Sequence, residues 1–292
     1  MAVLIVFLGA SVLAAGVAWG VATTWWRWDT AAPSVANDTI AVHARRHYRF
    51  VRWASARFDP EVATGSVLAL IAAVTVVGGS AFGIVLAMVR AHRGFADFDT
   101  SMARFGASHA TPLSTHVLRV VTQVGGAYVL VPLAVVVGAW EARRVRSWAT
   151  VWFLGIVVGG QYALADAIKA IVDRSRPDIL RLTGFSGPSF PSGHATASAA
   201  TFAAFALLAG RGRSHRTKAL LLAAAVGGTV LICATRVLLG VHWLTDVIAG
   251  VLLGWTWFAV TSIAFGGRRL RFGAPAVVAE RATDTTRRRA AA

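Results

Sequence analysis

Three short polar clusters stand between long apolar segments of this chain, at residues 169–177, 191–194 and 235–246. Together they supply lysine and arginine cations, two histidines, a carboxylate, a serine hydroxyl and a glycine at the start of a segment. Arginine offers a planar fork of donors and lysine a point charge, and both suit phosphate oxygens. This inventory predicts a site that binds a phosphate group and attacks it.

The first cluster follows an apolar segment. Lys169 stands three residues after Asp166 and four before Asp173, so it can pair with either of them along one helical face. Pro177 disfavours helix at Arg176, and we expect the chain to leave the helix there. About two helical turns separate Lys169 from Arg176, so both cations can point into one pocket at the membrane surface. In the alternative interpretation the basic residues here, Arg174 included, are anchors that reach for the membrane interface.

The second cluster opens the alanine-rich segment 194–210. Ser192 is a candidate N-cap, and the free backbone N–H groups of a helix start favour a bound anion. Gly193 would let an anion approach the backbone closely, and His194 lies beside it in the first turn. The alternative is a capped helix that carries a histidine by chance.

The third cluster contains a histidine and an aspartate four residues apart, His242 and Asp246. On a helix the two would share a face, and the carboxylate could accept Nδ1–H and leave Nε2 free to attack. Arg236 follows Thr235 and precedes His242 by six residues. In isolation, such a pair could equally be an ordinary helix-stabilising contact.

A metal centre at these residues is disfavoured. His194, His242 and Asp246 are ligands that suit zinc, but cations converging on the same site would repel a metal dication and attract an anion. The single cysteine, Cys233, rules out an intramolecular disulfide and a cysteine zinc site. We therefore expect no metal and no other cofactor.

The elements that position these clusters are predicted to be membrane helices. Of the 292 residues, 56% are hydrophobic and 14% charged, against roughly a quarter charged in soluble domains; the mean hydropathy is +0.62. Apolar segments of about 20 residues can span a bilayer. The chain has seven such segments, at 3–24, 62–90, 117–140, 148–172, 194–210, 218–235 and 246–266. The predicted fold class is an all-α, polytopic membrane helical bundle.

Charge placement predicts the topology. The formal net charge is +16, and Lys169 and Lys218 are the only lysines. A basic chain can bind nucleic acid, but these arginines gather in short connections between apolar segments, which is typical of cytoplasmic loops. We therefore expect the bilayer, and not nucleic acid, as partner, with the amino terminus and all three clusters on the extracytoplasmic side. The oligomeric state is left open.

The predicted domains follow from these segments. The first segment lacks a basic start and ends at the tryptophan-rich 25–28, a poor cleavage site, so we expect a retained transmembrane helix at 1–24. The connection 25–61 is basic, and its part 40–58 could be an interfacial helix or a solvated loop. The arginine-containing tail 267–292 has no apolar periodicity and is expected to be disordered.

In order and spacing, the three clusters resemble the signature of the type 2 phosphatidic acid phosphatase (PAP2) superfamily, K-x6-R-P, P-S-G-H and S-R-x5-H-x3-D. The matching residues are Lys169, Arg176 and Pro177, then 191–194, then Arg236, His242 and Asp246. Thr235 stands where serine is usual and keeps a hydroxyl. The resemblance covers about 62–266 and implies a six-helix phosphatase core, with the helix at 1–24 outside it.

The resemblance also implies a role for each matched residue. His242 would be the nucleophile that forms a phosphohistidine, and Asp246 would orient it. His194 would protonate the leaving group and then activate water. The phosphoryl oxygens would be held by Lys169, Arg176, Ser192, Gly193 and Arg236. Positioning and charge stabilisation are what phosphoryl transfer chiefly needs.

We therefore expect an integral plasma-membrane phosphatase that hydrolyses a lipid phosphate or diphosphate without a metal. Phosphatidic acid, phosphatidylglycerophosphate and a polyprenyl diphosphate such as undecaprenyl diphosphate are the candidates. Heavy use of arginine over lysine, and of alanine, hints at a GC-rich bacterial genome and favours the polyprenyl lipid. An anion-binding membrane transporter is the alternative, although no two related halves are evident. Haloperoxidase chemistry, which occurs in the same superfamily, is disfavoured because those enzymes are soluble.

Overall fold

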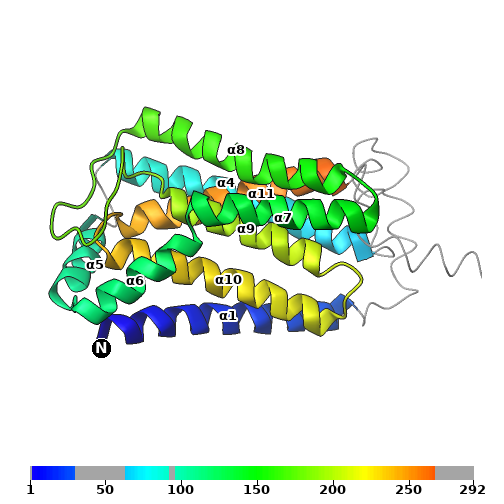
Figure 1. The fold of residues 1–292 in the computed structure, drawn as a ribbon, viewed down its shortest axis with the longest axis horizontal. Coiled ribbons are helices and arrows are strands. Elements are labelled where there is room, and N and C mark those ends of the chain that lie inside the picture. The colour runs from blue at the N-terminus through cyan, green and yellow to red at the C-terminus, as the bar shows by residue number, and fades with distance from the viewer. Residues whose placement is uncertain (1, 30–62, 92–95, 267–292) are drawn as a thin grey trace, which may run out of the picture.

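The computed structural model describes residues 2–29, 63–91 and 96–266 (Figure 1). Within these ranges every regular element is an α-helix, which confirms the all-α fold class. The helices are α1 (Ala2–Asp29), α4 (Ala63–Ala91), α5 (Ala96–Ser108), α6 (Pro112–Val124), α7 (Ala127–Val145), α8 (Ala149–Val172), α9 (Gly193–Ala209), α10 (His215–Leu238) and α11 (Leu244–Gly266).

Each of the seven apolar segments coincides with helix. Six described stretches are long and apolar enough to cross a membrane: Ala2–Thr23, Ala72–Ala91, Pro112–Val145, Ala149–Val172, His215–Leu238 and Leu244–Phe265. The seventh, α9, is shorter. The protein is therefore a multi-pass membrane protein.

The third predicted segment is two helices and not one. α6 ends at Val124 and α7 begins at Ala127, whereas α7 continues through Pro132. The break falls at Gly125 and Gly126, residues of low helix propensity. A side chain at Gly125 would also collide with Ile232 of α10, so this position accepts only glycine without rearrangement.

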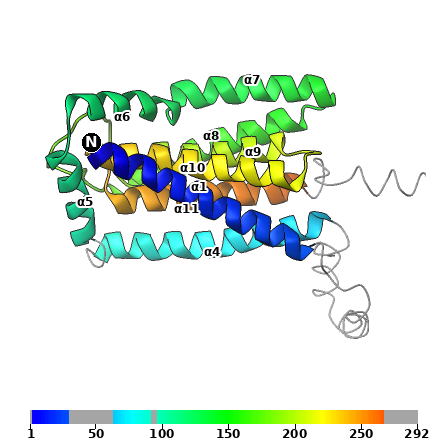
Figure 2. The same ribbon diagram turned by 90° about the horizontal axis from the view of Figure 1, so that it is seen from below.

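Small residues bring the central helices together. α9 packs against α8, α10 and α11, and its alanines are largely buried. Close approach of this kind is how membrane helices gain packing contacts without a hydrophobic driving force. At Gly250 of α11 an added Cβ would lie 2.7 Å from the Ser192 carbonyl oxygen, so the start of α9 rests directly on α11. α1 lies along α10 and α4 along α11 (Figures 1 and 2).

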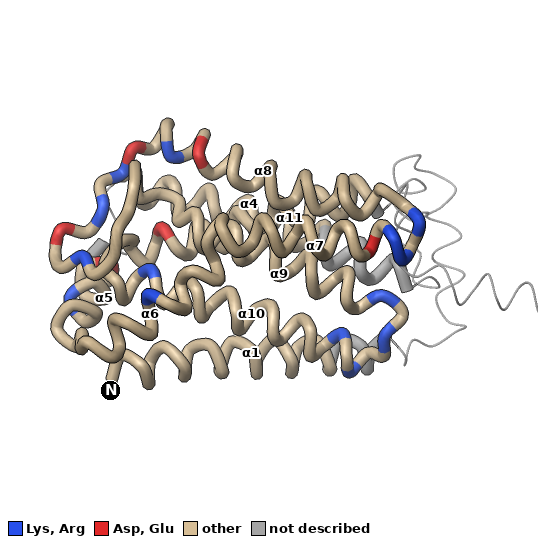
Figure 3. The backbone as a smooth tube through the Cα atoms, viewed as in Figure 1, with Lys and Arg blue, Asp and Glu red and all other residues tan. Residues whose placement is uncertain are grey.

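The two ends of the bundle differ in what they carry. α5, the connection 173–192 and the junction of α10 with α11 lie at one end, together with the amino terminus (Figure 1). The connections 146–148 and 210–214 lie at the other end, where basic residues gather (Figure 3). Lys and Arg lie at the site end as well (Figure 3), so the side that faces the cytoplasm stays a prediction.

Several expectations fall outside the described residues. They concern the basic segment 40–58 and the tail 267–292. The predicted domain boundaries therefore stay predictions. Most of the retained helix expected at 1–24 lies within α1, which packs on α10 through Ala15 and Gly227.

Candidate active site

All three polar clusters meet at one end of the bundle. Lys169 lies in the last turn of α8, His194 in the first turn of α9, and Arg236 in the last turn of α10. His194 is close enough to interact electrostatically with four other predicted site residues, Lys169, Arg176, Arg236 and His242. The structure thus brings together residues that are far apart in the sequence.

The end of α8 sets the position of the first cluster. The helix ends at Val172, earlier than expected, because Asp173 takes a left-handed conformation (φ 45°, ψ 45°) as its C-cap. Lys169 Nζ lies 3.3 Å from Asp166 Oδ1, one of its two predicted partners. An added Cβ at Gly193 would lie 3.4 Å from Nζ of the same lysine. Lys169 therefore reaches the start of α9.

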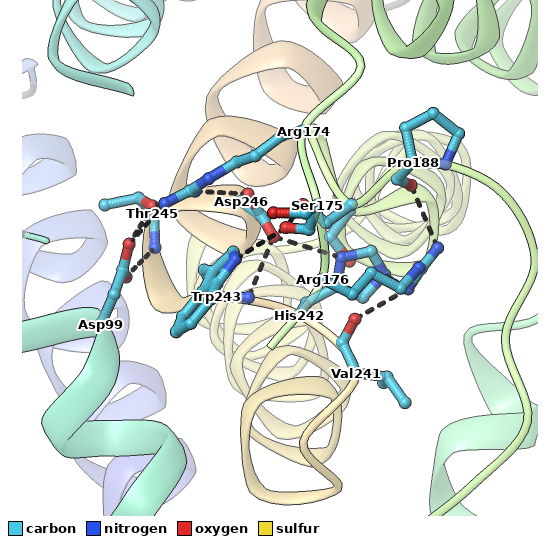
Figure 4. Close-up of polar contacts among 12 residues, drawn as sticks. Asp99, Arg174, Ser175, Arg176, Pro188, Val241, His242, Trp243, Thr245 and Asp246 are labelled. Carbon is cyan, nitrogen blue, oxygen red and sulfur yellow. Dashed lines mark hydrogen bonds and ion pairs between the residues drawn. The ribbon is translucent and has the colours of Figure 1, made fainter. Parts of the chain in front are cut away.

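Arg176 ties the loop before α9 to the junction of α10 and α11 (Figure 4). Its Nη1 donates to the Val241 carbonyl at 2.7 Å and lies 3.2 Å from His242 Nε2. Its other donors bind loop carbonyls at 2.8–3.1 Å, those of Ser186, Gly187 and Pro188. Burial lowers the pKa of the Arg176 guanidinium, and the Asp246 carboxylate opposes that shift.

Ser192 holds the N-cap position of α9 as predicted, but it makes no cap bond with its side chain. Its Oγ is buried and has no hydrogen-bond partner among the described residues. Its backbone N–H donates to the Asp246 carbonyl at 3.0 Å, which fixes the helix start against α11. The hydroxyl is therefore free to bind something other than its own helix.

The break between α6 and α7 also belongs to the site. An added Cβ at Gly126 would lie 3.5 Å from His194 Nε2. One turn earlier in α6, Thr122 Oγ1 accepts a bond of 3.1 Å from Arg236 Nη1. Sequence analysis did not single out either residue, since neither lies in a polar cluster.

Arg236 is still within α10, because the helix continues to Leu238 instead of ending at Thr235. The Thr235 hydroxyl donates to the Ile232 carbonyl and so serves the helix rather than the site. Arg236 is only 5% exposed, and its Nε has no partner among the described residues. A buried guanidinium with a free donor is suited to an anion.

His242 does not lie on a helix, contrary to the expectation from its spacing. It sits in the turn before α11, after Gly240, which has a left-handed φ of 70°. A side chain at Gly240 would also meet the Leu180 carbonyl, so only glycine fits there. The turn still brings His242 Nδ1 within 3.6 Å of Asp246 Oδ2, slightly beyond hydrogen-bond range.

The protonation of His242 follows from its surroundings. The side chain is 3% exposed. Burial lowers the pKa of the imidazole to about 4, against the effect of Asp246 and with that of Arg236 and Arg176. The ring is therefore neutral near pH 7. Because a guanidinium can only donate, the contact with Arg176 makes Nε2 an acceptor and places the ring proton on Nδ1, toward Asp246.

Asp246 belongs to a group of hydrogen-bonded side chains that we call the anchor cluster. Its members are Asp99, Arg174, Thr245 and Asp246 (Figure 4). Arg174 Nη1 donates to Asp246 Oδ1 at 2.6 Å, and its Nη2 donates to Asp99 Oδ2 at 3.0 Å. Asp99 in turn accepts the Thr245 N–H at 2.9 Å and the Thr245 hydroxyl at 2.6 Å. The second oxygen of Asp246 accepts the Trp243 N–H at 2.9 Å.

Sequence reasoning missed the anchor cluster. Arg174 was considered only as a membrane anchor, which is wrong, because its guanidinium joins two buried carboxylates. The position of Arg174 inside the first cluster could have indicated a role in the site. No sequence feature indicated such a role for Asp99, since it lies 75 residues from Arg174 and 146 from Thr245 in the chain.

The donor set favours an anion over a metal. Among the described residues no group of three or more histidine, cysteine or acidic side chains is arranged to hold a metal ion. The two buried carboxylates near His242 are both bonded to Arg174. What remains for a ligand is cations, a hydroxyl and a helix start, which suit phosphate.

Comparisons with known proteins identify the family of this chain. The sequence pattern of the PAP2 superfamily matches residues 149–270, which include every predicted site residue. Phosphatidylglycerophosphatase B of Bacillus subtilis (strain 168) is 31% identical over 147 residues, covering 49% of this chain and 71% of that relative. Decaprenylphosphoryl-5-phosphoribose phosphatase of Mycobacterium tuberculosis (strain CDC 1551 / Oshkosh) is 35% identical over 131 residues, covering 44% of this chain and 66% of that relative.

The fold is similar to that of a solved membrane enzyme. The crystal structure of a transmembrane PAP2-type phosphatidylglycerolphosphate phosphatase from Bacillus subtilis superposes with a TM-score of 0.61 at 28% identity. The match covers 68% of this chain and 98% of that one.

Proposed function

The chain belongs to the PAP2 superfamily and is a membrane phosphatase, and from this premise we propose that it hydrolyses a lipid phosphate or diphosphate through a phosphohistidine at His242. The observation that carries the proposal is a neutral, buried His242 beside two cations, Arg176 and Arg236, with unpaired buried donors on Ser192 and Arg236. Nothing in this mechanism calls for a metal.

In the first step, Nε2 of His242 attacks the phosphorus and the bond to the leaving oxygen breaks. His194 donates a proton to that oxygen, so the lipid alcohol, or the lipid monophosphate from a diphosphate, leaves in neutralised form. Asp246 stabilises the positive charge that develops on the ring through Nδ1–H. The phosphoryl oxygen takes the place of Nε2 as the acceptor for Arg176.

In the second step, His194 takes a proton from water, the water oxygen attacks the phosphorus, and the P–N bond breaks. Inorganic phosphate leaves and His242 returns to its neutral form. One histidine thus acts as acid and then as base, and the other carries the phosphoryl group. Burial and the cations around it lower the pKa of His194 to about 3. The negative charge of a bound phosphate opposes that shift, which lets His194 carry the proton that it donates to the leaving oxygen.

The phosphoryl oxygens are held by the donors that lack a protein partner. Ser192 Oγ and Arg236 Nε are buried and unpaired, and a buried unpaired donor costs about 1–3 kcal/mol. A phosphate would satisfy both of them, with Lys169 and the backbone at Gly193 completing the set. Charge stabilisation of this kind is the main source of rate in phosphoryl transfer.

The substrate we propose is amphiphilic, because the site lies at one end of a bundle of membrane helices. The relatives point to lipids by their names, one to phosphatidylglycerophosphate and one to a decaprenyl-linked phosphate. Polyprenyl diphosphate is our first candidate, followed by phosphatidylglycerophosphate and phosphatidic acid. We further propose that the site faces the extracytoplasmic side of the plasma membrane.

The test is phosphate release by the purified full chain in detergent from these three lipids, with and without EDTA. We expect release that is insensitive to EDTA, lost in His242→Gln, and retained in His116→Gln, which changes an exposed histidine of α6. Binding of the lipid phosphate without release would favour the transporter alternative. Activity that EDTA abolishes, or that survives in His242→Gln, would overturn the mechanism.

A further inference from the structure

A groove of about 840 Å³ lies between α7 and α8. It is lined on α7 from Val131 to Arg146 and on α8 from Trp148 to Tyr162. From Val131 to Arg146 the groove is about 22 Å long, at about 1.5 Å per helical residue. It therefore spans most of a hydrocarbon core of about 30 Å. Val131, Val135 and Gly155 in its lining are exposed, so the groove opens sideways toward the lipid.

The groove exists because glycines of α8 line it and leave the space beside them unfilled. Small residues four apart normally let two membrane helices approach closely. Gly138 does so, since an added Cβ there would lie 3.6 Å from Leu154 Cδ1. At Gly155 and Gly159 of α8, an added Cβ meets nothing within 4 Å. The α8 glycines therefore leave a long apolar space, the shape of a hydrocarbon chain.

One end of the groove is cationic. Arg143, Arg146, Ser147 and Trp148 line it where α7 turns into α8. Arg146 is the C-cap of α7 in a left-handed conformation (φ 50°, ψ 41°), a position that glycine usually fills. Both lining arginines are exposed. The nearby carboxylate of Glu141 forms its ion pairs with two arginines that do not line the groove, Arg144 and Arg211.

We propose that this groove binds one anionic phospholipid of the leaflet opposite the active site. An acyl chain lies between α7 and α8, and the phosphate lies at Arg143 and Arg146. The cations of Arg143 and Arg146 and the hydroxyl of Ser147 can bind a headgroup of net negative charge. Tryptophan is typical of the interface between headgroups and acyl chains, where Trp148 would lie. The site is separate from the catalytic residues, which lie at the other end of the bundle (Figures 1 and 3).

Basic residues at this end would attract anionic lipid loosely wherever they stood, so the proposal needs matched controls. Arg213 and Arg216 lie at the same end, in or beside the connection 210–214, but do not line the groove. Gly83 of α4 is exposed, and an added Cβ there also meets nothing within 4 Å. Substitutions at these positions make the same change in charge or in side-chain size as the groove variants, but outside the groove.

The test is native mass spectrometry of the full chain released from bilayers of equimolar phosphatidylglycerol and phosphatidylcholine with the same acyl chains. We expect one retained lipid, with phosphatidylglycerol preferred about tenfold. The double variant Arg143→Ala/Arg146→Ala should lose the preference, and Gly155→Leu/Gly159→Leu should lose the retained lipid. The control variants Arg213→Ala/Arg216→Ala and Gly83→Leu should match the wild type.

Two results would overturn the site. One is that Gly155→Leu/Gly159→Leu, whose side chains fill the groove, retains as much lipid as the wild type. The other is a preference that falls equally in the two arginine double variants, which would reduce the effect to general surface charge. Phosphatase activity of each variant checks that the bundle is intact, since none of these residues belongs to the catalytic site.

Discussion

The polar groups on the two sides of His242 are arranged in opposite ways. In the anchor cluster, both carboxylates accept hydrogen bonds on both of their oxygens. On the other side lies what we call the open cluster, Lys169, Ser192, His194 and Arg236. There Ser192 Oγ and Arg236 Nε are buried without a partner in the described part of the chain.

The difference separates support from binding. Buried ions stabilise a fold only when they are paired and fully hydrogen-bonded, and the anchor cluster meets that condition. Unpaired buried donors lower stability, and in the proposed mechanism the phosphate of the substrate pairs with those of the open cluster. Substitutions on the two sides should therefore change activity and stability in different combinations.

The largest effect is expected at Asp246, which belongs to the anchor cluster and also faces His242. Asp246→Asn keeps the shape but removes the charge that pairs with Arg174 and stabilises the charged ring. We expect kcat to fall by about 10³–10⁴-fold, as when a buried carboxylate that orients a catalytic histidine is neutralised. Tm in detergent should fall as well. An unchanged kcat would mean that Asp246 has no part in the reaction.

The next effect isolates the open cluster. Arg236→Gln removes a buried cation that lacks an ionic partner among the described residues, so kcat/KM should fall by about 10²–10³-fold while Tm stays constant or rises. Steady-state kinetics measure kcat/KM, and a thermal melt of the same preparation measures Tm. A lowered Tm together with normal kinetics would place Arg236 in the supporting structure instead.

A smaller effect is expected at the far side of the anchor cluster. Asp99→Asn leaves the substrate site untouched but loosens Arg174, and misplacement of a reacting group by about 1 Å can cost about 10²-fold in rate. We therefore expect kcat to fall by about 10–100-fold with KM unchanged, and Tm to fall. The kcat and KM values separate this positioning role from substrate binding.

Asp178→Asn is the matched control for that change. Asp178 pairs with Arg181 at the same end of the bundle, but its side chain is 95% exposed. Exposed ion pairs contribute little, about 0–1 kcal/mol. The control should therefore behave as the wild type. If Asp99→Asn also does so, the anchor cluster has no influence on the reaction.

The smallest effect concerns pH. The pKa of His242 is lowered from 6.5 to about 4 in the folded protein. Between these values the unfolded chain binds a proton that the folded chain does not, so the free energy of unfolding falls as pH decreases from 6.5 toward 4. His242→Gln should lose less stability over this range than the wild type. Tm at pH 7 and pH 5 measures it, and equal losses would contradict a neutral, buried His242.

The helices and the residues of the site could be predicted from the sequence because both depend on local pattern. Apolar length marks the membrane segments, and spacing marks the three clusters. What could not be predicted depends on contacts across the bundle. The break at Gly125 follows from packing against Ile232, and the turn that carries His242 follows from contact between Gly240 and Leu180.

The anchor cluster shows the same limit. Asp99 carries no local sign of its role, because its partners come from the connection after α8 and the start of α11. Arg174 could be placed near the site by its neighbours Lys169 and Arg176, but a single sequence does not say that it faces Asp246. A functional group whose partners are all distant in the chain becomes visible only in the folded structure.

The most direct test of the account is to trap the covalent intermediate. Purified protein is mixed with a lipid phosphate labelled with ³²P at the terminal phosphate, quenched in base, where phosphohistidine survives, and digested for peptide mapping. We predict label on His242, none on His194, and none anywhere in His242→Gln. Rapid turnover with no labelled protein at any time, or label that persists in His242→Gln, would contradict a phosphohistidine at this position.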